Sequence, residues 1–227
     1  MSLHPDFLKA IKITEKVFAK IPSLLTIGKT EKELASQIRK LIKSLGGQKE
    51  SFRIIVASGK RSAMIHGFAT DKIIERDDIV MLDLGVLYKK FRTDVTRTYF
   101  LGKTSPKQKN IYQLLLKAQK AGASLIKAGR PCKDIDIATR DVITKDGLGK
   151  FFRHSTGHGI KFKVHESPRI RTKSRGVLKE GVVITVEPGI YLKGWGGMRV
   201  EDMYLVTQKG FKLLTNIPRD FKQVIIR

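Results

Sequence analysis

The stretch Ile79–Tyr88, IVMLDLGVLY, decides the fold, because its pattern occurs again at Val183–Tyr191 as VITVEPGIY. In both copies an apolar run ends in a carboxylate, glycine stands two residues later, and tyrosine follows. A returning apolar segment then brings a further carboxylate. The four acids are Asp83 and Asp94 in the first copy and Glu187 and Glu201 in the second. Unpaired carboxylates are costly in an apolar core, so the repeat predicts two strand hairpins that together bind two divalent cations.

The repeat extends upstream of the carboxylates and indicates a duplicated architecture. Segment 28–34, GKTEKEL, resembles segment 129–135, GRPCKDI, at an offset of 101 residues, and Asp83 is offset from Glu187 by 104. Chance similarity between short apolar strings is the alternative. The similar offsets favour two half-units, about 1–104 and 105–227, sharing one core in a single domain over 1–227, a length that one domain fits. No accessory domain is expected at the N-terminus.

Hydrophobic periodicity predicts the same order of elements in each half, two helices followed by strands. A capping box at Thr30–Glu33 opens the second helix, and Ser105-Pro106 opens the third. The expected helices cover 5–20, 30–45, 105–128 and 133–147, and the expected strands cover 52–57, 79–84, 92–100, 182–186 and 199–206. This order predicts an α/β fold.

Composition indicates a globular chain without a membrane span. Hydrophobic residues make up 41% of the 227 residues and charged residues 29%, which is typical of folded domains. No apolar run reaches the roughly eighteen residues of a spanning helix, and the start, MSLHP, lacks the pattern of a signal peptide. The single cysteine, Cys132, excludes an internal disulfide. These features predict a cytoplasmic protein that does not enter a membrane.

The net charge of +24 is unevenly distributed. Between Lys150 and Arg175 there are eight Lys or Arg residues and one acid, Glu166. Such a field attracts polyanions, so weak contact with the ribosome or another RNA through this basic surface is one interpretation. A lysine-rich, solvated surface is the other, because no nucleic-acid-binding motif accompanies the charge.

Three of the five histidines fall within twelve residues, in HSTGHG at 154–159 and VHESP at 164–168. Flanking glycines make His158 the candidate ligand. Four carboxylates and one imidazole favour Mn²⁺, Fe²⁺ or Co²⁺, with Zn²⁺ as an alternative, whereas structural zinc prefers Cys and His. Two such ions about 3.5–4 Å apart can activate a shared water, which predicts a hydrolase. For Asp94, a salt bridge to Arg92 or Arg97 is the alternative role.

Taken together, these residues resemble those of the pita-bread metallopeptidases, which include methionine aminopeptidases, Xaa-Pro aminopeptidases and prolidases. The resemblance covers about Ile55 to Thr207. It implies a pita-bread fold, with two pseudo-symmetric halves of antiparallel sheets covered by helices. It also implies five metal ligands, which are Asp83, Asp94, His158, Glu187 and Glu201. The Xaa-Pro branch is favoured by three motifs, which are TDVTRT at 93–98, HSTGHGI at 154–160 followed by VHESP, and GMRVE at 197–201.

The resemblance implies a metallo-exopeptidase that hydrolyses an N-terminal peptide bond, preferentially Xaa-Pro, by a metal-bridged hydroxide. Of the two divalent ions, Mn²⁺ is preferred, with Co²⁺, Fe²⁺ or Zn²⁺ as alternatives. Glu187 would also pass a proton to the leaving amine, while His66 and His165 would hold the scissile amide and its oxyanion. The substrate-binding candidates are His154, Tyr191 and Arg199, the last of which also braces the metal cluster. The oligomeric state stays open.

Two alternatives to this function remain at the level of sequence. A methionine aminopeptidase acting on nascent chains would fit the chain length and the positive charge, and a non-catalytic ribosome- or RNA-binding protein could use the same fold. The sequence departs from the Xaa-Pro pattern at Lys161, where glycine is usual, and in the short segment 192–197. The N-terminal domain of many Xaa-Pro enzymes is not expected here, which puts proline selectivity in question.

Overall fold

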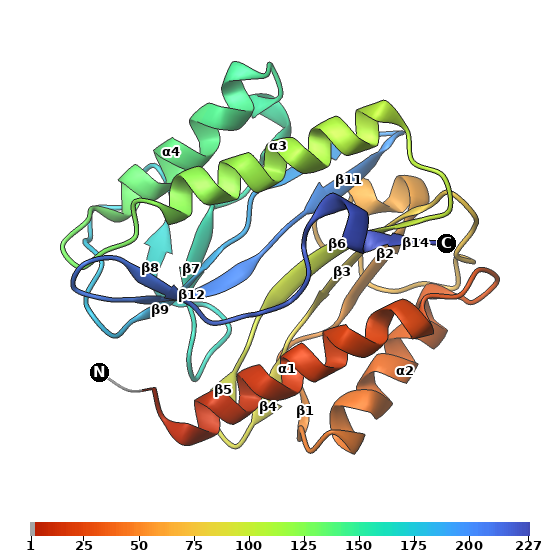
Figure 1. Cartoon of the computed structure of the whole chain (residues 1–227), viewed down its shortest axis with the longest axis horizontal. Coiled ribbons are helices and arrows are strands. Elements are labelled where there is room, and N and C mark those ends of the chain that lie inside the picture. Colours follow the sequence, from red (N-terminus) through yellow and green to blue (C-terminus); the bar gives the residue numbers. More distant parts are fainter. Residues whose placement is uncertain (1–2) are drawn as a thin grey trace.

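The computed structural model describes residues 3–227. Figure 1 shows two pairs of helices along opposite sides of the molecule, with the strands between them. One pair is α1 (Pro5–Leu24) and α2 (Glu31–Ser44), and the other is α3 (Pro106–Ala123) and α4 (Cys132–Lys145). The predicted α/β class and the order of two helices followed by strands in each half are confirmed.

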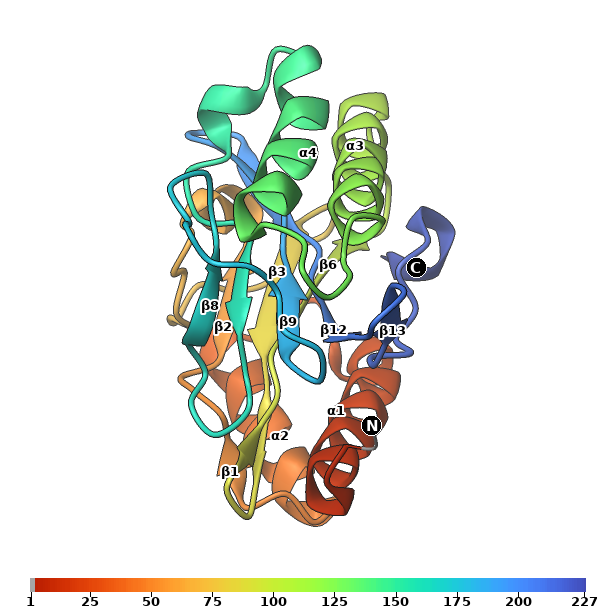
Figure 2. The same ribbon diagram turned by 90° about the vertical axis from the view of Figure 1, so that its left-hand side faces the viewer.

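Two main sheets carry most of the strands, and Figure 2 shows them from the side. One sheet has the order β14-β6-β3-β2, formed by Ile225–Ile226, Val95–Leu101, Ile79–Leu84 and Ile55–Ser58. The other has the order β13-β12-β9-β7-β8, formed by Phe211–Leu213, Asp202–Val206, Val183–Val186, Gly157–Gly159 and Glu166–Ile170. Pairing is antiparallel in both, apart from the parallel pair of β14 and β6. The prediction of antiparallel sheets therefore holds with this one addition.

Helix starts follow the predicted caps. The Thr30 hydroxyl accepts a hydrogen bond from the backbone N–H of Glu33 (3.1 Å), and the Glu33 carboxylate accepts from the N–H of Thr30 (2.7 Å). This capping box satisfies two N–H groups that a helix end leaves without partners. The predicted end of the third helix at 128 is wrong, because the chain turns after Ala123 and the N–H of Ala128 donates to Thr207 (3.0 Å).

The first carboxylate hairpin contains a local break at Gly85. β3 pairs with β6 up to Leu84 opposite Val95, and the hairpin then continues as β4 (Val86–Tyr88) with β5 (Phe91–Arg92). A side chain on Gly85 would place its Cβ 1.7 Å from the carbonyl oxygen of Thr93, so only glycine fits there. The break takes Thr93 and Asp94 out of the strand ladder and leaves Asp94 free to turn inward.

The second hairpin breaks at the corresponding place. β9 pairs with β12 up to Val186 opposite Asp202, and β10 (Gly189–Leu192) then pairs with β11 (Gly196–Arg199). The single strand predicted at 199–206 is therefore wrong. The chain changes its pairing partner at Glu201, whose N–H instead donates to the Thr96 carbonyl of the first hairpin (3.1 Å). The two halves are thus joined at a predicted ligand.

One hydrophobic core spans both halves. Buried residues from α1 and α2, such as Val17 and Leu34, belong to the same cluster as Leu115 of α3 and Met198 of β11. Among residues 3–227, no helix has the length and apolar character needed to cross a membrane. The shared core fixes the two hairpins relative to each other and so fixes the distances between their carboxylates.

Candidate active site

The predicted ligands lie where strands end or where the two hairpins break. Asp83 is near the end of β3, and His158 is the central residue of β7. The other three candidate ligands occupy the breaks, which are Asp94 before β6, Glu187 after β9 and Glu201 between β11 and β12. Each backbone break frees a side chain from the alternation of the sheet, so carboxylates from two hairpins can face one another.

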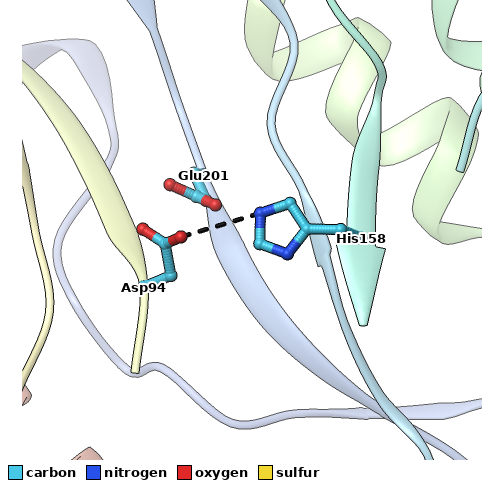
Figure 3. Close-up of side chains that lie close together, drawn as sticks. All are labelled: Asp94, His158 and Glu201. Atoms are coloured by element: carbon cyan, nitrogen blue, oxygen red, sulfur yellow. Dashed lines mark ion pairs between the residues drawn. The ribbon is translucent and has the colours of Figure 1, made fainter. Parts of the chain in front are cut away.

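The structure brings these side chains into one buried cluster. Figure 3 shows Asp94, His158 and Glu201 pointing toward one another, and one ligand atom from each lies within 4.8 Å of the others. The Nε2 atom of His158 is 3.6 Å from Asp94 Oδ2 and 3.3 Å from Glu187 Oε1. A single imidazole among converging carboxylates is the arrangement that the sequence predicted for a metal site.

Three oxygens of this cluster are buried without a hydrogen-bond partner among residues 3–227. They are Asp83 Oδ1, Asp94 Oδ1 and Glu201 Oε1. Buried carboxylate oxygens are nearly always hydrogen-bonded or bound to a metal, because an unpaired one carries a large desolvation cost. The unsatisfied oxygens all belong to predicted ligands. This donor set, rich in oxygen and with one imidazole, fits divalent cations such as Mn²⁺.

The raised pKa values of three acids in the cluster also favour a site for cations. Burial raises the pKa of Asp94 and of Glu201 well above the ordinary range, and repulsion from neighbouring carboxylates adds to the rise. Burial also raises the pKa of Asp83, against the attraction of Arg199. So many acids cannot all ionise together without compensating positive charge, which bound cations would supply.

Glu187 differs from the other acids. Burial acts to raise its pKa, but the hydrogen bond and charge of His158, with His154 and Arg199, lower the pKa to about 2. Its Oε1 also accepts a hydrogen bond from the Thr185 hydroxyl (3.2 Å). Glu187 is therefore the acid of the cluster whose pKa is lowered, because it lies close to both His158 and His154. Repulsion from neighbouring acids instead adds to the raised pKa of Asp94 and of Glu201.

Arg199 holds two acids of the cluster, Asp83 directly and Glu201 through the Thr96 hydroxyl. Its guanidinium donates to Asp83 Oδ2 (2.6 Å), to the Thr96 hydroxyl (2.9 Å) and to the Tyr191 hydroxyl (2.6 Å). The Thr96 hydroxyl in turn donates to Glu201 Oε2 (2.8 Å). Each contacted carboxylate thus has one oxygen held by the protein, and its other oxygen is one of those without a partner.

The cluster forms one end of a cavity of about 510 Å³. His66, His154 and His165, the histidines predicted for catalysis or substrate binding, all line this cavity. The His165 ring lies 4.4 Å from the His158 ring, centre to centre. Arg199 also lines the cavity, but Tyr191 does not. The Tyr191 hydroxyl is instead enclosed between Arg199 and His154 Nε2 (2.8 Å), and burial raises the pKa of Tyr191 to about 12.

The surroundings of His154 and His165 lower the pKa of both side chains. Burial lowers the pKa of His154 to about 4, although the charge of Glu187 opposes this. Burial also lowers the pKa of His165, together with the charges of His158 and Arg169. His154 is therefore neutral at physiological pH.

The alternative role for Asp94, a salt bridge to Arg92 or Arg97, is not formed. Arg97 pairs with Asp202 (2.6 Å), and Arg92 donates to the backbone carbonyls of Ser51 and Phe162. Both arginines therefore stabilise the fold rather than pair with Asp94.

Lys161, where the sequence departs from the family pattern, does not line the cavity. Its side chain is exposed and lies over the Phe162 ring (4.8 Å to its centre).

Sequence reasoning missed the apolar part of the cavity lining. Phe52, Ile55 and Phe68 form an apolar surface there, and the guanidinium of Arg53 lies 4.3 Å above the Phe68 ring. These residues belong to a strand start and to a loop with no repeated pattern. The only available signal was the aromatic and basic character of FR at 52–53, at the start of the strand predicted at 52–57, which in the structure begins only at Ile55. Arg169 also lines the cavity, although it was counted only within the basic stretch.

The fold and this donor set are those of the pita-bread class of proteins. The model of metallopeptidase family M24 matches residues 6–208. The chain belongs to this family. It is 44% identical over 212 residues to the Xaa-Pro dipeptidase of Pyrococcus furiosus, covering 93% of this chain and 61% of the relative.

Solved structures agree with the sequence comparison. An Xaa-Pro dipeptidase from Bacillus anthracis superimposes with a TM-score of 0.94 at 42% identity, covering 97% of this chain and 61% of that one. An X-Pro aminopeptidase from Thermotoga maritima gives 0.93 at 38% identity, covering 97% and 62%. The predicted pita-bread fold is thereby confirmed. The chain spans about 60% of the length of these relatives and is similar to that part of them in fold and in sequence.

Proposed function

We propose that this protein is a metal-dependent exopeptidase that hydrolyses the peptide bond after an N-terminal residue, preferentially before proline. The observation that carries the proposal is the set of three buried carboxylate oxygens without partners, gathered around His158 at the end of an open cavity. Membership of the metallopeptidase family and the names of the relatives, Xaa-Pro dipeptidase and X-Pro aminopeptidase, support the reaction and the substrate class.

The proposed metal site comprises two divalent cations held by Asp83, Asp94, His158, Glu187 and Glu201. The oxygen-rich donor set favours Mn²⁺, with Co²⁺, Fe²⁺ or Zn²⁺ as alternatives. When bound, such ions lower the pKa of a water molecule and polarise a carbonyl group. The same cations would offset the repulsion among the acids.

The roles of the protein side chains follow from their places in the cavity. The Glu187 carboxylate would take a proton from the attacking water and deliver it to the nitrogen of the leaving amine. His165 and His66 would donate hydrogen bonds to the scissile amide and to the developing oxyanion. His154 would contact the residue after the cut bond, with its ring held by the Tyr191 hydroxyl. Tyr191 itself would act by positioning this ring.

The apolar part of the cavity lining supports selection of proline. Phe52, Ile55 and Phe68 offer an apolar surface to a pyrrolidine ring, which has no N–H that would need a partner. Arg53 and Arg169 lie on the same cavity and have no carboxylate partner among residues 3–227. They would bind the C-terminal carboxylate of a short peptide, which favours a dipeptide or tripeptide substrate over a nascent chain.

The test is a comparison of peptides with purified protein loaded with Mn²⁺. Ala-Pro and Ala-Pro-Ala should be hydrolysed faster than Met-Ala-Ser, close to two metal ions should be found per chain, and a chelator should abolish hydrolysis of all three. Cleavage of Met-Ala-Ser alone would favour the methionine aminopeptidase alternative. Absence of bound metal and of hydrolysis would overturn the proposal and leave the non-catalytic alternative, for which the comparisons give no support.

Replacing His165 by alanine should lower kcat/KM for Ala-Pro by roughly 10²–10⁴, the scale of one lost acid–base or oxyanion group. The metal content should not change, because His165 lies beside His158 rather than within the carboxylate cluster. Elemental analysis and steady-state kinetics check both statements. His4→Ala serves as the matched control, since His4 is an exposed histidine at the start of α1. Loss of metal in His165→Ala would contradict the assigned role.

Replacing Arg169 by glutamine should raise the KM for Ala-Pro by roughly tenfold to a hundredfold, because a hydrogen bond to a charged group contributes about 1.5–3 kcal/mol. The effect should disappear when the dipeptide carries a C-terminal amide in place of the acid. Arg171→Gln, at an exposed position outside the cavity lining, is the control and should behave like the parent. An equal effect on acid and amide would show that Arg169 does not bind the carboxylate.

A further inference from the structure

Glu31, the first residue of α2, is one of the buried acids that lie outside the metal cluster. The Glu31 side chain is 0% exposed, yet both of its carboxylate oxygens have partners. Oε1 accepts from the Ser58 N–H (2.7 Å) and hydroxyl (2.9 Å), and Oε2 accepts from the Thr70 N–H (3.0 Å) and hydroxyl (2.8 Å). The guanidinium of Arg61 also donates to Oε2. One carboxylate therefore binds both ends of the segment 58–70.

This segment reaches the active site on its other side. The N–H of Gly197 donates to the Ser62 hydroxyl (2.8 Å), and Arg199, which braces the metal cluster, donates to the Ile65 carbonyl (3.3 Å). Segment 58–70 is therefore held by α2 at both of its ends and by β11 in its middle. It carries His66, Ile65 and Phe68, all of which line the catalytic cavity.

The position of the His66 side chain depends on the backbone of segment 58–70. Its ring makes no hydrogen bond to the part of the chain from 3 to 227, and the residue is exposed at the cavity. The second N–H group of Arg61 donates to the Phe68 carbonyl (3.0 Å), so the ion pair of Arg61 with Glu31 extends the fixation to both sides of His66. The backbone around His66 is held by Glu31 with Arg61, by the contact of Arg199 to Ile65, and by the bridge of Phe68 to Ile55 at the start of β2.

We propose that Glu31 is a positioning residue for His66, acting by closing segment 58–70 onto α2. The inference rests on the catalytic role that the proposed function gives to His66. Glu31 touches neither the metal ligands nor the cavity. In Glu31→Gln the new NH₂ group would face N–H donors. The substitution would also remove the negative charge that holds Arg61. A displacement of about 1 Å in a catalytic group can cost on the order of 10² in rate.

The first test is a double-mutant cycle on kcat/KM for Ala-Pro with Mn²⁺-loaded protein. Glu31→Gln should lose 10- to about 100-fold in kcat with unchanged metal content. In the His66→Ala background the same substitution should cost less than about threefold, because coupled residues are not additive. Asp136→Asn is the matched control. Asp136 is a buried acid on α4 that accepts hydrogen bonds from the Thr156 hydroxyl (2.7 Å) and the Thr172 hydroxyl (2.6 Å). The factor by which Asp136→Asn lowers kcat/KM should be the same in the parent and in the His66→Ala background.

The second test is hydrogen–deuterium exchange, which does not depend on activity. Glu31→Gln should speed exchange in 58–70 and leave 154–160 unchanged, and Asp136→Asn should do the reverse. Unchanged exchange in 58–70, or a cost of Glu31→Gln that is equal with and without His66, would overturn the proposal. If Glu31→Gln does not fold, Thr70→Val removes one donor to Glu31 and enters the same cycle. A parent protein that cleaves no peptide would contradict the proposed function, and the exchange result would then decide on segment 58–70.

Discussion

Replacing Glu187 by glutamine is expected to lower kcat/KM for Ala-Pro by several orders of magnitude. The substitution removes a charge from the proposed metal site and the group proposed to carry the proton to the leaving amine. Loss of a general acid–base group alone costs roughly 10²–10⁴, and a weakened metal site adds to that. Because Glu187 has a pKa of about 2, through His158 despite its burial, the parent carboxylate is ionised at every pH used in such an assay. Glutamine cannot reproduce this state.

The measurement is steady-state hydrolysis of Ala-Pro together with metal content, for the parent, Glu187→Gln and the control Glu180→Gln. Glu180 is an exposed acid just before β9, so its variant should match the parent. Activity of Glu187→Gln within tenfold of the parent would exclude Glu187 as the proton carrier. A metal content of about one ion per chain with little activity would separate its role as a ligand from its role in proton transfer.

Replacing Arg97 by alanine should lower the free energy of unfolding by about 3–5 kcal/mol, the cost of removing one partner of a buried ion pair. Arg97 is fully buried and donates to Asp202 (2.6 Å), to the carbonyl of Glu201 (2.6 Å) and to the carbonyl of Ile217 (3.0 Å). It thereby joins β6 of the first half to β12 of the second. Without it these backbone acceptors lose their buried donor.

Urea denaturation of the parent and of Arg97→Ala tests this expectation, with the midpoint shifting while the slope stays constant. The control is Lys32→Ala, which breaks the solvent-exposed pair of Lys32 with Asp71 (2.7 Å) and should cost no more than about 1 kcal/mol. A loss in Arg97→Ala that is no larger than in the control would show that Arg219, which also binds Asp202 (2.6 Å), is sufficient to hold this junction.

Much of the candidate site was accessible from sequence because its pattern is local and repeated. The run 79–84 was predicted as a strand and is β3 without change of bounds, and the capping box at Thr30 forms as expected. The candidate ligands, from Asp83 to Glu201, converge in the structure although they span more than half of the chain. Their recurrence at nearly constant offset, rather than any single residue, made this predictable.

The sequence by itself determined the order of helices and strands, the two carboxylate hairpins and the candidate metal ligands, because hydrophobic periodicity and repeat spacing are properties of short segments. Only the tertiary structure decided how these parts are held. The strand predicted at 199–206 breaks at Glu201 because its pairing partner changes from β10 to β9. Glu187 and Glu201 are chemically identical, yet their pKa values shift in opposite directions, because His158 and His154 lower the pKa of the first whereas burial and neighbouring acids raise the pKa of the second. Such differences depend on groups far apart in the chain, which no local pattern records.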